Sequence, residues 1–365
     1  MDDSITYLEI ARNLPGEYAR FPGVPDVQRP PGYPLFLFLF YFLMGGGPLG
    51  TLVVQKILVF LTALGIYKTA ALYAPRRHAR NSALLYLFLP YPALFSSLFL
   101  TETMFVALLV WGAYGAMTGR YFAAGLMLAA GVWVKPLALA AAAVFFVAAA
   151  ISRLRRGKVP VTALWLAVLP AAAAGVWTFR NAKNAETPTF STSGNTAKLY
   201  GVAAAIDALS EGADWSEASL VYYGEKRRGE TRFVGRFPAQ ETAVFDAPFP
   251  WRTMLQNPVA TIKFYGLAFW GMAKGTGFAT AEKISHSRTT AFAVALWGAF
   301  AIFALWAAAL WPFANRRFEV WTLLVAGATL VFAHASAWAD GRYRMPADAF
   351  ILLAATPTLW SRKRF

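Results

Sequence analysis

Long unbroken apolar runs constrain this chain more than any other feature of its sequence. On a soluble helix the apolar residues recur every three or four positions, whereas these runs continue over whole helix lengths. A helix of about 20 apolar residues matches the thickness of a bilayer core and satisfies its own backbone hydrogen bonds there. The runs therefore predict an all-α integral membrane protein, a polytopic bundle of about nine spans.

Nine runs have the length and composition expected of spans. They cover approximately residues 48–73, 81–100, 102–118, 121–134, 136–152, 159–179, 288–312, 318–338 and 346–360. The apolar stretch Tyr33 to Met44 follows two prolines and ends at three glycines. Because it is too short to span, we expect an interfacial helix there.

Five basic clusters fall on one side if the spans alternate. They are 76–80, Arg120, 153–158, 316–317 and 362–364. The positive-inside rule assigns that side to the cytoplasm. A net charge of +15 would indicate a nucleic-acid binder in a soluble protein, but here the basic residues punctuate apolar runs, so no nucleic-acid partner is predicted.

This alternation divides the chain into four regions. Residues 1–47 form a first extracytoplasmic loop with interfacial helices, 48–179 a transmembrane bundle, 180–287 an extracytoplasmic loop region with an interfacial helix, and 288–365 the C-terminal transmembrane helices. The predicted location is the inner (plasma) membrane, with a site facing the periplasm or outside. The chain opens with acids instead of a signal peptide, so it either starts N-out or lacks a preceding helix.

Two acids on the outer face each have two interpretations. Asp3 could cap a short amphipathic helix, which the residues alone favour, or it could take a proton from an acceptor hydroxyl. Glu102 after Thr101 is an ordinary helix opening, but an acid with long apolar flanks often faces a cavity.

The outer cations are equally ambiguous. Arg29, before Pro30-Pro31, is either a solvated loop charge or a guanidinium held for phosphate. Lys135 either snorkels to the surface or meets a buried phosphate or carboxylate, and Arg180 could be an interfacial anchor. Cations at this density need an anion or the nearby acids to neutralise them, and a lipid phosphate is a natural candidate.

Short motifs in a fixed order strengthen this interpretation. They are Asp3-x-x-x-Tyr7, Arg29-Pro-Pro-Gly-Tyr33, Thr101-Glu102, Lys135-Pro136, Arg180-Asn181 and Arg342-Tyr-Arg-x-Pro346. The set resembles the GT-C glycosyltransferases that use polyprenyl-phosphate sugars, including the dolichyl-phosphate-mannose protein mannosyltransferases and the bacterial aminoarabinose transferase of lipid A. That family has a helix before the first-loop acid, and this chain does not.

The resemblance implies roles for individual residues. The candidate catalytic acids are Asp3, with Asp2 able to share its role, and Glu102. The candidate donor-phosphate contacts are Arg29, Lys135, Arg180, Arg342 and Arg344, and the candidate pocket residues are Tyr7, Tyr33, Asn181 and Tyr343. The chain has no cysteine and three dispersed histidines, so no metal site is predicted, although a divalent metal bound by the acids stays open.

The expected function is therefore transfer of a sugar from a polyprenyl-phosphate carrier to a hydroxyl of an unidentified glycan, lipid or protein, with inversion. The expected partners are this sugar donor and the lipid bilayer. The alternatives are a transporter or flippase of a lipid-linked or anionic substrate, or a non-catalytic scaffold. Transporters often carry inverted repeats, and no repeat is evident in this sequence.

Overall fold

The computed structural model describes residues 2–21, 23–185, 188–193, 201–214, 217–228, 250–274, 287–290, 292–293, 296, 317–335 and 345–359. Helices dominate these residues, which confirms the all-α prediction. Sheet is limited there to one short antiparallel hairpin, β1 (Ala19–Phe21) and β2 (Val24–Pro25), which the sequence patterns did not predict. Gly23 turns this hairpin with φ +77°, a conformation that costs glycine little.

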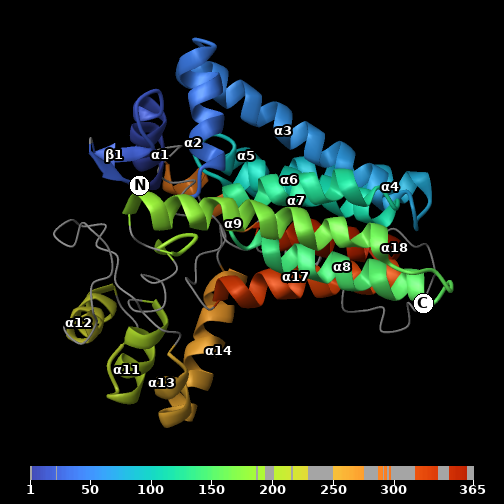
Figure 1. Ribbon diagram of the computed structural model, residues 1–365. Helices are drawn as coiled ribbons and strands as arrows, with labels where there is room; N and C mark the ends of the chain where they lie inside the picture. The colour runs from blue at the N-terminus through green and yellow to red at the C-terminus, as the bar shows by residue number, and fades with distance from the viewer. Residues whose placement is uncertain are drawn as a thin grey trace.

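Eight helices lie side by side and form the body of the protein (Figure 1). They are α3 (Gly47–Ala70), α4 (Arg76–Phe88), α6 (Glu102–Met117), α7 (Tyr121–Val134), α8 (Ala138–Leu154), α9 (Trp165–Ala185), α17 (Phe318–Ala335) and α18 (Met345–Leu359). The short η2 (Val161–Leu164) leads into α9. The bounds of α3, α6, α7, α8, α17 and α18 lie within three residues of the predicted spans, α9 is shifted by six residues from 159–179, and α4 covers only part of 81–100. Most of the predicted span 288–312 lies outside the described residues.

One predicted span is not continuous. Residues 81–100 were expected to form a single helix, but α4 ends at Phe88 and a short α5 (Pro90–Phe95) follows. Leu89 has the extended ψ of 138° that a residue before proline favours, so the helix breaks there. The chain from Ser96 to Thr101 is then non-helical until α6 begins.

The N-terminal elements and the long central loop gather at one end of the bundle (Figure 1). They comprise α1 (Asp2–Asn13), the hairpin, α2 (Gly32–Leu37), η1 (Phe38–Leu43), α11 (Ala204–Ser210), α12 (Glu217–Arg228), α13 (Trp251–Gln256) and α14 (Pro258–Lys274). The predicted helical character of residues 33–44 is confirmed by α2 and η1, and α14 is a helix within the 180–287 region, where one was predicted. We call this end of the bundle the polar end, after the charged residues of α1, of the 26–31 loop and of the starts of α6 and α8.

Several of the described basic turns lie at the opposite end of the bundle. A guanidinium nitrogen of Arg317 donates to the Tyr73 carbonyl after α3, and the Arg155 guanidinium lies 5.3 Å from the Phe318 ring. Thr118 and Arg156 line one cavity together with the start of α17. The assignment of this end to the cytoplasm stays a prediction.

The bundle is inverted in polarity compared with a soluble protein. On α3, Gln55, Thr62 and Thr69 are completely buried, whereas Phe60 is 63% and Ile57 50% exposed. A soluble helix places its apolar stripe inward, so this arrangement is typical of a helix whose outer face meets lipid.

Helix length supports fewer membrane spans than the nine predicted from the apolar runs. Two helices, Gly47–Ala70 and Val161–Ala185, are long and apolar enough to cross a membrane, and the other apolar helices of the described part have 10–17 residues. Two such helices are weak support by themselves, so the prediction of nine spans is not confirmed.

Candidate functional site

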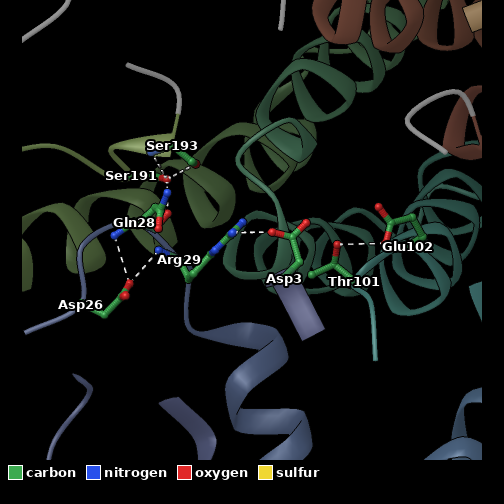
Figure 2. Close-up of polar contacts among 8 residues, drawn as sticks. All are labelled: Asp3, Asp26, Gln28, Arg29, Thr101, Glu102, Ser191 and Ser193. Carbon is green, nitrogen blue, oxygen red and sulfur yellow. Dashed lines mark hydrogen bonds and ion pairs between the residues drawn. The ribbon is translucent and has the colours of Figure 1, made fainter. Parts of the chain in front are cut away.

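An ion pair joins the first helix to the loop before α2. An oxygen of the Asp3 carboxylate lies 2.5 Å from a terminal nitrogen of Arg29, and the two side chains are 27% and 19% exposed (Figure 2). The Arg29 guanidinium also lies 5.3 Å from the centre of the Tyr7 ring. Asp3 thus binds a cation from its position inside α1, and Arg29 is not the solvated loop charge that was one of its two interpretations.

The Arg29 loop is shaped by Asp26, which the sequence patterns missed. An oxygen of the buried Asp26 carboxylate accepts hydrogen bonds from the backbone N–H groups of Gln28 (3.0 Å) and Arg29 (2.8 Å). This is the local turn that Asp favours. The Tyr18 hydroxyl donates to the carbonyl of Arg29 at 3.0 Å, which fixes the loop from the other side. The spacing Asp-x-x-Arg was the only sequence signal for this turn.

Burial and charge shift the pKa values around this loop. Burial raises the pKa of Asp26, although its backbone hydrogen bonds and Arg29 oppose the change. Burial also raises the pKa of Tyr18 well above its usual value, and the charge of Asp26 adds to this. Burial lowers the pKa of Arg29, but Tyr7, Asp3 and Asp26 together outweigh it and raise that pKa. Arg29 therefore stays a cation at every physiological pH.

Arg180 supports the same loop from α9. Its guanidinium donates to the carbonyls of Asp26 (2.6 Å) and Tyr18 (2.9 Å) and stacks 4.8 Å from the Trp177 ring. These contacts give Arg180 a structural role in holding the N-terminal segment, which differs from the phosphate contact predicted for it. The neighbouring Asn181 is buried and donates to the carbonyl of Thr189 at 2.8 Å, so it also positions a loop.

A second ion pair is buried where α6 begins and α7 ends. The Lys135 ammonium lies 2.8 Å from the Glu102 carboxylate, and the side chains are 15% and 3% exposed. Lys135 therefore has the carboxylate partner that was one of its two interpretations. Glu102 opens α6, as its sequence position suggested, but its carboxylate faces protein and not solvent.

A cluster of aromatic rings links the two ion pairs. The rings of Tyr7 and Tyr33 meet edge to face at 5.1 Å, and Met104 of α6 packs against the same cluster. Burial raises the pKa of Tyr33 well above its usual value, and the charges of Glu102 and then Tyr7 add to this shift. Tyr33 therefore interacts electrostatically with both residues. The Tyr33 hydroxyl donates to the Gln55 side chain of α3 at 2.8 Å.

Close backbone packing sets the position of α2. A Cβ atom added at Gly32 would lie 2.8 Å from the carbonyl carbon and oxygen of Trp133, near the end of α7. Only glycine allows this close approach. Because Gly32 follows the Arg29 loop and Trp133 lies two residues before Lys135, the contact places the loop near the end of α7. The glycine of the Arg-Pro-Pro-Gly-Tyr motif therefore has a packing role.

Serine hydroxyls close the other side of the Arg29 loop. The Ser191 hydroxyl donates to the Gln28 carbonyl at 2.6 Å and shares a hydrogen bond with Ser193 at 2.6 Å (Figure 2). The backbone N–H of Thr192 donates to the Val27 carbonyl at 3.1 Å. The sequence analysis gave no role to this serine pair.

The described residues thus bring together eight of the predicted site residues at the polar end. These are Asp3, Tyr7, Arg29, Tyr33, Glu102, Lys135 and, as supports, Arg180 with Asn181. Asp2 belongs to α1, but its side chain is outside the described part of the structure. Arg342, Tyr343 and Arg344 lie outside the described residues altogether.

The two ion pairs account for part of the positive charge that the sequence analysis assigned to an external anion. Acids neutralise Arg29 and Lys135, so these cations do not by themselves demand an external anion. The Arg29 Nε is buried and makes no hydrogen bond, as is also true of the Trp177 Nε1 beside Arg180. Within the described ranges, no three His, Cys, Asp or Glu side chains gather as a metal site would require.

No family model matches this chain, and neither a curated protein nor a solved structure gives a significant match.

Proposed function

We propose that this protein is a membrane glycosyltransferase that moves a sugar from a polyprenyl-phosphate carrier to an acceptor hydroxyl, with inversion at the anomeric carbon. One observation carries the proposal. Arg29 binds the Asp3 carboxylate through a terminal nitrogen, while its buried Nε makes no hydrogen bond. A buried donor without a partner is costly, so it favours a ligand oxygen at this position.

The pair provides an acid and a cation where a transferase needs both. Asp3 is 27% exposed, so its carboxylate can be reached by an acceptor. A guanidinium binds phosphate oxygens in a fixed planar geometry, and its Nε can take a phosphate oxygen while a terminal nitrogen keeps the carboxylate. Arg29 can therefore hold the donor phosphate and orient the base at the same time.

The proposed reaction is a direct displacement. Asp3 takes the proton of the acceptor hydroxyl, whose oxygen forms a bond to the anomeric carbon. The bond between that carbon and the phosphate oxygen breaks, and its electron pair stays on the lipid phosphate. Arg29 stabilises the charge that grows on this leaving group. Attack opposite to the leaving phosphate inverts the anomeric carbon, as in one-step glycosidases.

Inverted polarity supports a bilayer setting with more crossings than helix length alone identifies. Large apolar side chains such as Phe88 (72% exposed), Phe122 (51%) and Phe179 (71%) point away from α4, α7 and α9. Exposed apolar surface on this scale on a soluble bundle would cause aggregation, whereas lipid accepts it. We therefore propose a polytopic arrangement of about nine spans in the inner (plasma) membrane, with the polar end outside.

The test uses purified protein and a polyprenyl-phosphate sugar labelled in the sugar. Asp3→Asn should reduce transfer at least about a thousandfold, because the general base and its charge are lost together. Glu9→Gln is the matched control, since Glu9 also binds an arginine from α1, with its carboxylate 2.7 Å from Arg20. Full activity of Asp3→Asn, or equal losses in both variants, would contradict the assignment of Asp3.

The same experiment separates the alternatives. A flippase would move the labelled lipid across a vesicle membrane without releasing lipid phosphate, and a scaffold would do neither.

A further inference from the structure

Two adjacent residues in the middle of α3, Gln55 and Lys56, both contact the non-helical segment that begins at Ser96. Gln55 is buried, accepts from Tyr33 and donates to the carbonyls of Ser96 (3.2 Å) and Leu98 (2.8 Å). Lys56 lies on the outward side, and α3 runs along one edge of the bundle (Figure 1). Gln55 therefore holds the non-helical 96–101 segment from inside, and Lys56 meets it at the outer wall.

Lys56 has polar contacts but no counter-charge. Its ammonium donates to the Ala93 carbonyl (2.9 Å), the Ser96 hydroxyl (2.8 Å) and the Ser97 hydroxyl (2.7 Å). All three partners are neutral. None of the ion pairs among the described residues includes Lys56. The contact with Ala93 is exposed, so the ammonium can be reached from outside the bundle.

The surroundings of Lys56 on this wall are apolar. Val53 is 50%, Ile57 50% and Phe60 63% exposed, and all three lie within four residues of Lys56 on α3. A cation without an anionic partner is unfavourable next to hydrocarbon. The anions that reach such a wall are those that carry an apolar body, which makes a lipid phosphate the fitting partner.

Lys56 lies at the same level along the bundle axis as the Glu102–Lys135 pair. Lys56 lies 14 residues before the end of α3 at Ala70, and Glu102 lies 15 residues before the end of α6 at Met117. At a rise of about 1.5 Å per residue, both are roughly 21–23 Å from the basic end. Lys56 on the outer wall is thus level with the Glu102–Lys135 pair inside.

A hydroxyl beside Lys56 completes a phosphate-binding set. The Ser97 hydroxyl donates to the carbonyl of Ala93 at 2.8 Å in an exposed contact and can rotate toward a new acceptor, whereas Ser96 is completely buried and holds Lys56 from inside. An ammonium with a neighbouring hydroxyl donor matches the several acceptor oxygens of a phosphate. The break in the helix at Pro90 and Pro92 is what brings this hydroxyl next to α3.

We propose that Lys56 and Ser97 form a binding site for a lipid phosphate on the outer wall of the bundle, through which the donor enters sideways from the bilayer. The direction of entry depends on the proposed transferase function, whereas the binding itself does not. The shared chemistry is a phosphate ester on an apolar tail. A polyprenyl phosphate and a phosphatidylglycerol both have it, and the experiment distinguishes them.

The experiment measures binding without turnover. The full chain is placed in nanodiscs of phosphatidylcholine, and the affinity is measured for a short-chain polyprenyl phosphate, for the uncharged polyprenol and for phosphatidylglycerol. Lys56→Met should weaken polyprenyl-phosphate binding by about 10–100-fold, the loss expected for a charged hydrogen bond. Binding of polyprenol should not change.

Two further variants separate a binding role from a structural one. Lys68→Met is the matched control, because Lys68 is on the same helix but lies over the Trp111 ring at 5.9 Å, near the basic end. It should bind the phosphate lipid as the unaltered protein does. Lys56→Arg keeps the charge and should recover most of the affinity, whereas a purely structural lysine would not be rescued in binding alone.

Each outcome decides the proposal. A loss limited to polyprenyl phosphate assigns the site to the donor, and an equal loss for phosphatidylglycerol supports a general lipid-phosphate site. Unchanged affinity of Lys56→Met for both lipids overturns the proposal, as does an equal loss in Lys68→Met. If the protein binds through Lys56 but transfers no sugar, the transferase function fails and the binding site stands.

Discussion

Separating the buried Glu102–Lys135 pair should destabilise the protein strongly. The two charged atoms are 2.8 Å apart, and the side chains are only 3% and 15% exposed. Removing one member of such a pair leaves a buried charge without this partner and costs about 3–5 kcal/mol. Because Lys135 retains some access to solvent, we expect about 3 kcal/mol for Lys135→Met and a similar value for Glu102→Gln.

The double variant tests whether this loss comes from the pair. Without either charge there is no unpaired group to bury, so Glu102→Gln with Lys135→Met should cost about 4 kcal/mol or less, below the sum of the singles. The coupling energy is then about 2 kcal/mol. The assay is unfolding in mixed micelles by a denaturing detergent, followed by tryptophan fluorescence.

The Glu9–Arg20 pair provides the comparison. Its atoms are equally close, at 2.7 Å, but Glu9 is 40% and Arg20 26% exposed. Solvent screens such a pair, and its coupling energy should be about 0.2–1 kcal/mol. The reasoning is refuted if the Glu102–Lys135 coupling is no larger than this one, because burial would then not decide the strength of the interaction.

Two further variants test the loop that carries Arg29. Gly32→Ala should lower the melting temperature, since its Cβ would meet the Trp133 carbonyl at 2.8 Å, whereas Gly175→Ala has nothing within 4 Å of its Cβ and should be neutral or stabilising. An unchanged melting temperature in Gly32→Ala would contradict the close packing of α2 on α7. Asp26→Asn keeps an acceptor for the two N–H groups of the turn. Because burial raises the pKa of Asp26, the folded state favours its protonated form, and the stability of the unaltered protein falls as pH rises through that pKa. Asp26→Asn should lack this part of the pH dependence, so its advantage in melting temperature should grow from acid to neutral pH, and a constant difference would refute the assignment.

Much of the fold follows from the sequence because long apolar runs leave few choices. The bounds of α6 and α7 agree with the runs 102–118 and 121–134 to within one residue. The break after Phe88 was missed because the run stays apolar through Pro90 and Pro92. Composition records how apolar a segment is, whereas the break depends on backbone geometry that only the prolines signal.

The charged pairs of the polar end could be anticipated only in part. Asp3, Arg29, Glu102 and Lys135 were singled out because charges are rare in this sequence, whereas Asp26 was missed, and a catalytic or binding role for any of them stays a prediction. The partner of each charge could not be read from the chain, because Asp3 and Arg29 are 26 positions apart, and Glu102 and Lys135 are 33 apart. Such contacts are set by how helices pack, which a linear pattern does not contain.

Arg180 illustrates why a cation near a predicted site is weak support for a ligand. From sequence, an arginine that ends an apolar run suits a phosphate, a headgroup or a backbone carbonyl equally well. The structure gives its donors to the carbonyls of Asp26 and Tyr18, which lie outside the helices and strands; the Tyr18 carbonyl also accepts from the Asp26 N–H at 3.0 Å. Irregular chain at a helix end needs donors, so a nearby arginine is first available to the protein itself. A buried donor with no partner, as at Arg29 Nε, is therefore the stronger sign of a ligand than the number of cations nearby.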